Sequence, residues 1–312
     1  MSNASRVAVL LMAYGTPRTR EEIEPYYTDI RRGRPPTPEA LADLTARYDA
    51  LGGTSPLAAR TEAQRDALQR ALDAVQPGRF EVSLGLKHAE PKIEAAVDAI
   101  AAAGFGHIVG LVLAPHYSAY SVGQYLDRAR AAAEPHGVPV SGVESWATEP
   151  AFVDFVARDL AAKLAALPEN TKVFFTAHSL PQRIIDAGDP YPQELRSTAE
   201  AVAAAAGLGD WSNWAIAWQS AGRTPEPWLG PDILQVIDDL AAAQTDEQHD
   251  GQSGVLVSAV GFVADHLEVL YDLDIEAAHR AESHGIAFAR TACVNDDPTV
   301  MAALARRVIE AV

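Results

Sequence analysis

The sequence predicts an α/β protein whose strands form parallel sheets. Short runs of β-branched and aliphatic residues alternate along the chain with Ala-rich stretches in which apolar residues recur every three or four positions. This alternation is typical of βαβ units, because a parallel strand is reached through a crossover that is usually a helix. With 312 residues, the chain is long enough for two lobes of moderate size that each bury a core.

Seven apolar runs are expected to be strands, because each is a short β-branched or aliphatic segment. They are residues 7–14, 80–87, 107–116, 138–143, 172–178, 214–219 and 254–262. Helical periodicity predicts helices at 39–52, 61–75, 92–104, 152–167 and 299–312. Asp297 stands where it can cap the last of these helices, with Pro298 in its first turn.

Two segments are predicted to be loops. Polar residues dominate 242–254, and two prolines and a glycine interrupt 179–191. The chain also contains a weak internal sequence repeat, or echo: 111–121 and 174–183 each run from a strand through Ala, His and Ser into a loop. A duplicated half-chain would explain this echo, and so would a chance resemblance between two buried strands.

Composition and charge exclude several classes of protein. The formal net charge is −17, from 25 Lys and Arg against 42 Asp and Glu, which argues against a nucleic-acid partner. The hydrophobic fraction of 48% is that of an ordinary folded protein, and no apolar run reaches the roughly eighteen residues of a membrane span. Cys293, the one cysteine, cannot form an internal disulfide or hold a cysteine-ligated iron–sulfur cluster. We therefore expect a cytoplasmic protein without such a cluster and without integral membrane association.

The densest basic cluster lies at residues 30–35, where Arg31, Arg32 and Arg34 follow one another closely. A solvated surface turn explains such a cluster, and so does a local site for an anionic ligand. Composition alone favours the surface turn.

Reactive side chains gather where predicted strands end. Tyr14, Lys87, His88, His116 and His178 all lie at or just past the carboxyl end of a strand. In open α/β sheets, this edge is where ligands bind. Each residue taken singly is also explained as a strand-end polar group that bonds to nearby backbone. Their coincidence favours a ligand site.

The segment 261–278 raises a question of charge. Read as a helix, it puts Asp265, Glu268, Asp272 and Glu276 on one face, where each like-charged pair costs about 0.2–0.5 kcal/mol. A cation or a passing proton would relieve this repulsion, and carboxylate oxygens suit hard divalent ions. A capping pair formed by Asp265 and Glu268 is the alternative, although it leaves the other two acids unexplained. A neutral imidazole at His178 could accept a proton near pH 7 or bind a metal.

The stretch 173–191 resembles the signature segment of ferrochelatases, which insert ferrous iron into porphyrins. Other blocks agree in order along nearly the whole chain: LLMAYGTP, YYTDIRRGRPP, YDALGGTSPLA, GLKHAEP, LAPHYSAYSVGQY, WQSAGRTPEPWLGP and VGFVADHLEVLYD. The pattern is most similar to the monofunctional coproporphyrin III ferrochelatases of Gram-positive bacteria. The resemblance implies a chelatase-like fold of two Rossmann-type lobes, each with a parallel four-stranded sheet flanked by helices, with the porphyrin held in the cleft.

The lobes implied by this resemblance are residues 6–143 and 144–296, and the helix at 297–312 is expected to pack back on the first lobe. The second lobe carries His178 and Glu268. The implied reaction inserts Fe²⁺ into coproporphyrin III in haem biosynthesis, gives coproheme and releases two protons. Fe²⁺ is then a substrate, and no organic cofactor is implied.

The resemblance also implies roles for individual residues. His178 and Glu268 match the catalytic pair, and Tyr14 joins them as a residue that approaches the metal. The residues that match porphyrin contacts are Tyr14, Arg31, Arg47, Ser55, Lys87 and Tyr125. Asp272 and Glu276 match an outer acidic site that a hydrated Mg²⁺ ion can occupy.

Three other functions stay open from the sequence alone. The chain could metallate protoporphyrin IX, it could insert another metal into a more carboxylated tetrapyrrole, or it could carry coproheme without making it. The absence of an apolar lip favours the water-soluble coproporphyrin. The implied partners are coproporphyrin III and Fe²⁺, together with a transient contact with coproheme decarboxylase, and the implied state is a monomer.

Overall fold

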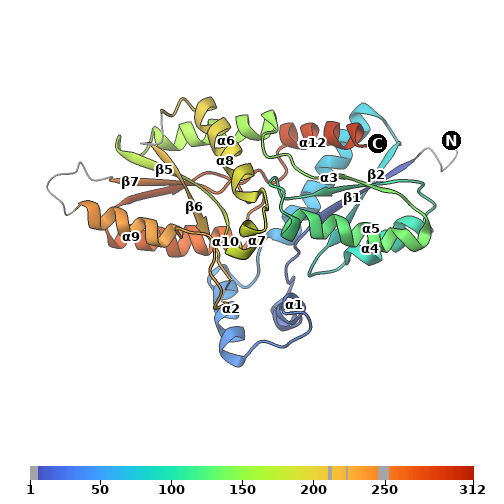
Figure 1. The fold of residues 1–312 in the computed structure, drawn as a ribbon, viewed down its shortest axis with the longest axis horizontal. Coiled ribbons are helices and arrows are strands. Elements are labelled where there is room, and N and C mark those ends of the chain that lie inside the picture. The colour runs from blue at the N-terminus through green and yellow to red at the C-terminus, as the bar shows by residue number, and fades with distance from the viewer. Residues whose placement is uncertain (1–5, 210–212, 223, 245–252) are drawn as a thin grey trace. The chain divides into compact units, whose positions relative to one another are not determined.

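The computed structural model describes residues 6–209, 213–222, 224–244 and 253–312 (Figure 1). By internal contacts, the chain divides into two compact units. The first contains the described residues up to Trp146, together with Ala264–Leu267 and Asn295–Val312. The second contains Ala147–Val263 and Glu268–Val294.

The first unit is built on a four-stranded parallel sheet in the order β2-β1-β3-β4. Its strands are β1 (Val7–Ala13), β2 (Phe80–Leu86), β3 (Ile108–Val112) and β4 (Val140–Val143). Every residue of β1 is buried, as expected for a central strand with helices on both faces. Because parallel strands share a direction, Tyr14 and Lys87 follow their strands at the same edge of the sheet.

Helices cover both faces of this sheet. The helices of these layers are α3 (Leu57–Val75), α4 (Ile93–Ala102), α5 (Gln124–Ala133) and α12 (Pro298–Glu310), with a π-helix at Ala119–Gly123. The helices α1 (Ile23–Ile30) and α2 (Pro38–Ala50) pack against each other instead of on the sheet. Figure 1 shows α4 and α5 on one side of the sheet and α3 and α12 on the other. The fully buried Leu10, Met12, Val97 and Leu126 are members of one core on the α4 and α5 side.

The second unit repeats this plan with a parallel sheet in the order β6-β5-β7-β8. Its strands are β5 (Thr171–His178), β6 (Trp214–Gln219), β7 (Gly254–Ser258) and β8 (Ala287–Arg290). Its helices are α6 (Pro150–Leu164), α7 (Gln182–Asp186), α8 (Tyr191–Ala205), α9 (Ile233–Gln244) and α11 (Ala278–Ser283). The short helix α10 (Leu267–Leu270) begins in the first unit and continues into the π-helix Asp272–Ala277.

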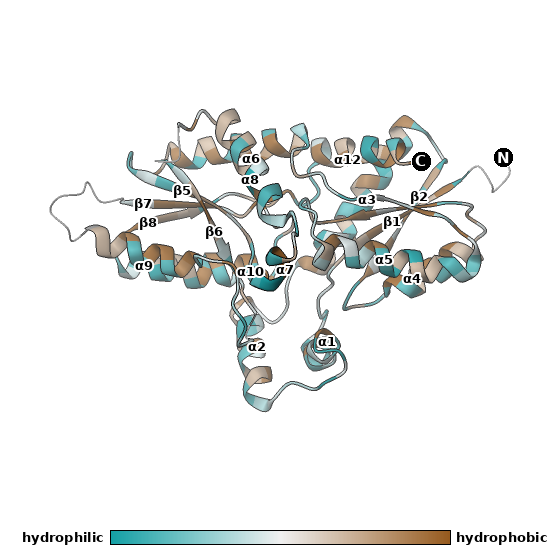
Figure 2. Ribbon diagram, viewed as in Figure 1, coloured by the Kyte–Doolittle hydropathy of each residue, from teal (hydrophilic) through white to brown (hydrophobic). Residues whose placement is uncertain are grey.

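Hydropathy follows this layering within each unit. Figure 2 shows the strands mostly in the brown of apolar residues, whereas the helices are striped with teal. This striping is typical of helices that pack an apolar face on a sheet and leave a polar face in solvent. Among the described residues, no helix has the length and apolar character needed to cross a membrane.

The predicted fold class is confirmed, and so are the seven predicted strands and the five predicted helices, with bounds that move by a few residues. The Asp297 side chain accepts hydrogen bonds from the amides of Thr299 and Val300, as expected of a cap. The count of seven strands was wrong, because β8 is an eighth within the described chain. Its four residues are all half-buried, so they show no clear alternation.

Two further predictions need correction. The segment 179–191 is not a continuous loop, because α7 forms in it with Pro181 at its N-cap position. The internal echo paired β3 with β5, but the strand orders make β1 the counterpart of β5 and β7 the counterpart of β3. Of the predicted loop 242–254, residues 245–252 lie outside the described chain, and 242–244 belong to α9.

Candidate active site

In the second unit, β5 places His178 beside Glu268. The Nδ1 atom of His178 lies 2.5 Å from the carbonyl oxygen of Ser179. A carbonyl oxygen only accepts, so this contact assigns the proton of the neutral ring to Nδ1. Nε2 then carries the lone pair and lies 3.8 Å from Oε2 of Glu268, with the two side chains 35% and 36% exposed. The pair offers a proton acceptor next to a carboxylate, both within reach of a ligand.

Side-chain hydrogen bonds hold the backbone of both residues. Gln219 donates from Nε2 to the carbonyl of Glu268 at 3.1 Å, and Thr176 donates to the side-chain carbonyl of Gln219 at 2.8 Å. The Tyr191 hydroxyl donates to the carbonyl of His178 at 3.2 Å. Burial, followed by the charges of Glu268 and Asp189, raises the pKa of Tyr191, so its hydroxyl stays protonated and keeps donating. Sequence reasoning did not single out Gln219 or Tyr191, because a glutamine at a strand end carries no periodic signal.

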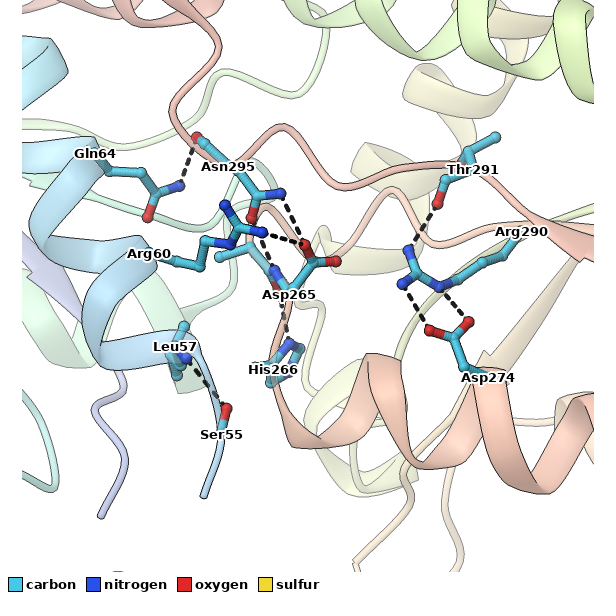
Figure 3. Close-up of polar contacts among 11 residues, drawn as sticks. Ser55, Leu57, Arg60, Gln64, Asp265, His266, Asp274, Arg290, Thr291 and Asn295 are labelled. Atoms are coloured by element: carbon cyan, nitrogen blue, oxygen red, sulfur yellow. Dashed lines mark hydrogen bonds and ion pairs between the residues drawn. The ribbon is translucent and has the colours of Figure 1, made fainter. Parts of the chain in front are cut away.

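The predicted row of four acids on one helix face is wrong. The segment 261–266 precedes α10, which begins only at Leu267, and the residue before that helix is His266 rather than Asp265. The carboxylate of Asp265 accepts from Asn295 at 2.9 Å and lies 3.4 Å from the guanidinium of Arg60 (Figure 3). Asp265 is therefore neither part of the helix that carries Glu268 nor its N-cap, so both interpretations of Asp265 were wrong.

Asp272 and Glu276 lie in the π-helix, where the amide of Glu276 donates to the carbonyl of Tyr271 at 2.9 Å. Asp272 is buried and accepts a 2.5 Å hydrogen bond from the Ser220 hydroxyl, whereas Glu276 is exposed. Within the described parts of the chain, no three His, Cys, Asp or Glu side chains are grouped to hold an ion. An ion at the two carboxylates would thus keep water ligands, which is typical of Mg²⁺.

In the first unit, Tyr14 follows β1 with 41% of its surface exposed. The ring centre of His88 lies 4.5 Å from that of Tyr14, and Tyr26 packs edge-on at 6.5 Å. Nδ1 of His88 lies 2.7 Å from the carboxylate of Asp29, which also binds the ammonium of Lys92 at 2.9 Å. Burial lowers the pKa of His88 to about 4, outweighing the opposing effect of the hydrogen bond that His88 donates to Asp29. A neutral imidazole therefore supports the Tyr14 ring.

Lys87 is a half-buried cation with two other cations nearby. Its ammonium donates to Oε1 of Gln124 at 3.0 Å and lies 5.1 Å from the ring centre of Tyr125. Burial, with the charges of Arg128 and Arg32, lowers the pKa of Lys87 to about 8. An anionic carboxylate placed there would relieve the repulsion among these cations.

The other predicted porphyrin contacts each have a local partner. Arg31 and Arg34 each donate from Nε to the other's carbonyl, at 3.3 Å and 3.4 Å, which makes the surface turn that composition favoured. Arg47 pairs with Asp43 along α2 at 3.4 Å, and the buried Ser55 hydroxyl accepts from the amide of Leu57 at 3.2 Å. These bonds hold the side chains in place in the first unit.

His116, another strand-end residue, is only 2% exposed. Burial lowers its pKa to about 3, so it is a neutral histidine inside the unit.

A family model described as Ferrochelatase matches residues 6–312. The chain belongs to the ferrochelatase family. The motifs that first indicated this family are thus part of a match that extends over nearly all of the sequence.

Curated relatives of this ferrochelatase match over similar lengths. The coproporphyrin III ferrochelatase of Halalkalibacterium halodurans is 46% identical, with 96% of this chain and 95% of the relative covered. That of Bacillus subtilis is 44% identical, with 98% and 97% covered. The ferrochelatase of Herpetosiphon aurantiacus is 42% identical, with 95% of each chain covered.

Solved structures support the fold. The sirohydrochlorin chelatase SirB from Bacillus subtilis subspecies spizizenii, in complex with cobalt, aligns with a TM-score of 0.55 and 13% identity. The alignment covers 98% of this ferrochelatase and 95% of the other chain. A structure of SirB from Bacillus subtilis with Fe³⁺ gives a TM-score of 0.56 at 14% identity, with the same coverage. At such identities, the likeness concerns the chelatase fold alone.

The depressed pKa of His88 makes acid unfolding of this ferrochelatase depend on that residue. Between its unfolded value of 6.5 and its folded value of about 4, the unfolded chain binds a proton that the folded chain does not. As the pH is lowered through that window, the free energy of unfolding should decrease by up to about 1.4 kcal/mol per pH unit because of this group. Guanidinium unfolding of the parent and of His88→Phe, compared at about pH 6.5 and about pH 4.5, should show a shallower loss in the variant. Equal losses in the two proteins would mean that His88 titrates normally.

Proposed function

We propose that this ferrochelatase inserts ferrous iron into coproporphyrin III and so produces coproheme and two protons for haem biosynthesis. The observation that carries the proposal is the His178 and Glu268 pair, with Nε2 facing the carboxylate at 3.8 Å. The choice of porphyrin draws on the relatives named coproporphyrin III ferrochelatase, which are aligned over nearly their full length.

Metallation requires the loss of two pyrrole protons, which water removes poorly at neutral pH. The Nε2 lone pair of His178 accepts a proton, and the Nδ1 hydrogen bond to Ser179 keeps the ring in the accepting tautomer. The imidazolium that forms is stabilised by the carboxylate of Glu268. Because 36% of the Glu268 side chain is exposed, it can pass protons to solvent and return His178 to its neutral form.

Tyr14 has a different role in this proposal. Its ring stands exposed at the end of β1, held by His88 and Tyr26, so it offers a fixed surface for the macrocycle. Its hydroxyl oxygen is the group that would approach iron as an axial ligand. The iron is the substrate of the reaction, and it exchanges water ligands for porphyrin nitrogens.

The carboxylates of coproporphyrin III would bind the basic residues of the first unit. Lys87 gains most from an anion, because its charge is buried beside other cations. Arg31, Arg47, Ser55 and Tyr125 are the further contacts that we propose. A tetra-anionic ligand can bind a protein with a net charge of −17 when cations converge locally in this way.

We further propose that Asp272 and Glu276 bind a hydrated Mg²⁺ ion. One or two carboxylates completed by water are the usual environment of this ion, and the Ser220 bond fixes one of the two groups. The monomeric state and the transient contact with coproheme decarboxylase stay predictions that rest on the resemblance to the family.

Anaerobic mixing of the protein with Fe²⁺ and coproporphyrin III tests the proposed function. We expect the free-base absorbance to disappear rapidly, and much more slowly with protoporphyrin IX in parallel. The variant Glu268→Gln should bind the porphyrin but lose about a hundredfold or more in kcat, because a neutral amide neither stabilises the imidazolium nor carries protons.

Glu282→Gln removes an exposed carboxylate from α11 and serves as the matched control. A Glu268→Gln variant as fast as this control would remove Glu268 from the proton pathway. Tight coproheme binding without turnover by the parent would identify a carrier instead of an enzyme.

Lys87→Met tests the anion site. We expect about tenfold weaker binding of coproporphyrin III, measured by quenching of porphyrin fluorescence, because a charge-assisted hydrogen bond is lost. Binding by the parent should also weaken as the pH rises above about 8, where Lys87 loses its charge, and the variant should lack this step. Lys163→Met, at an exposed position of α6, is the control. Unchanged affinity in Lys87→Met would place the propionates elsewhere.

The Mg²⁺ proposal is tested by calorimetric titration of the porphyrin-free protein with MgCl₂. Asp272→Asn combined with Glu276→Gln should abolish the binding heat seen with the parent, since neutral amides are weak ligands for this ion. A parent that binds no Mg²⁺ at millimolar concentration, or a double variant that binds as well as the parent, would exclude this site.

A further inference from the structure

A cluster of polar contacts in the first unit joins residues far apart in the sequence. The Asn295 side chain accepts a hydrogen bond from the backbone amide of Asp265 at 3.0 Å and donates to the Asp265 carboxylate at 2.9 Å. Arg60 of α3 lies 3.4 Å from the same carboxylate (Figure 3). We call the paired contacts between Asp265 and Asn295 the clasp. One side chain thus fixes both the backbone and the carboxylate of Asp265.

The backbone of Asn295 is itself held in an uncommon conformation. Its φ of +47° lies in the left-handed region, which asparagine and aspartate tolerate better than most residues. The fully buried Gln64 of α3 donates to the carbonyl of Asn295 at 3.0 Å. α3 therefore supports the backbone from which the Asn295 side chain extends toward Asp265.

The clasp lies next to the helix that carries Glu268. Asp265 is two residues before α10, which begins at Leu267, and three residues before Glu268. Between them, the imidazole of His266 makes a 2.9 Å contact with the carbonyl of Ala264. α10 continues into the π-helix and then α11, so Glu268 lies in the first turn of this helical segment. The direction in which it starts depends on the residues before it.

We infer that the clasp is a positioning device for Glu268, with Asp265 and Asn295 as positioning residues rather than catalytic ones. This inference rests on the proposed function, in which Glu268 stabilises the protonated His178. A proton-handling group has to be held to within about half an ångström of its productive position. A displacement of about 1 Å from a remote change can lower a rate by two orders of magnitude.

The variant Asn295→Asp tests the clasp with little other change. Aspartate keeps the size and the tolerance of left-handed backbone, and it still accepts from the Asp265 amide, but it sets two carboxylates against each other. We expect kcat for anaerobic iron insertion into coproporphyrin III to fall about tenfold, with the KM for porphyrin within about twofold of the parent. Asn295→Gly, which suits the same backbone and lacks the amide, should show the same loss and covers the case that the first variant does not fold.

The double variant Asn295→Asp with Asp265→Asn restores an amide–carboxylate pair with the two groups exchanged. Its kcat should return to within about threefold of the parent. Asp297→Ala is the matched control, because it removes the cap of α12 two residues away without touching the clasp. We expect a lower melting temperature and an unchanged kcat from this control.

The outcomes separate the inference from the function beneath it. A parent that inserts iron, together with single variants at the parent's kcat, would overturn the clasp alone. The clasp would also be overturned if Asp297→Ala lost as much kcat as Asn295→Asp, or if the double variant stayed as slow as the single one. A parent that inserts no iron would overturn both the proposed function and this inference.

Discussion

The chemistry of this protein depends on one constraint, the shared direction of parallel strands. Because the strands of a parallel sheet all end at one edge, residues that follow different strands become neighbours in space. In the first sheet, β1 and β2 are in register to Ala13 and Leu86, and so Tyr14 and Lys87 come next at the same edge. In the second, His178 of β5 is in register with Gln219 of β6, whose side chain holds the backbone of Glu268. Each unit thus assembles its part of the chemistry by the same rule.

The sequence contained enough information to predict this edge, because β1 is a continuous apolar run followed by Tyr14 and β5 is a mainly apolar run that ends in His178. It did not contain the partners of those side chains. Asn295 and Asp265 are thirty positions apart, and their contact depends on α3 supporting a turn that periodicity does not encode. The π-helix at Asp272 likewise broke the expected spacing of the acids, since a 3.6-residue period was assumed throughout.

The charged side chains that follow the strands differ between the units: a lysine in the first and carboxylates beside a histidine in the second. In the first, burial and the charges of Arg128 and Arg32 lower the pKa of Lys87 to about 8, as expected of a cation that a nearby anion would stabilise. In the second, His178 lies beside a carboxylate, and Asp272 and Glu276 follow it along the chain. The overall negative charge of the protein therefore says little about its ligand, because Lys87 in the first unit and the carboxylates in the second have opposite signs.

The division of the chain into units that are not continuous in sequence also affects how the protein is made. The first unit includes α12, whose buried Val300, Leu304 and Val308 pack with α3 of the same unit. All strands of the second unit, by contrast, are synthesised before α12. In chain order, the last strand of the second unit therefore precedes the last helix of the first unit, although the first unit begins earlier. The first unit is therefore the later of the two to have all its elements, and a chain cut before Pro298 would leave the face of α3 that α12 covers exposed to solvent.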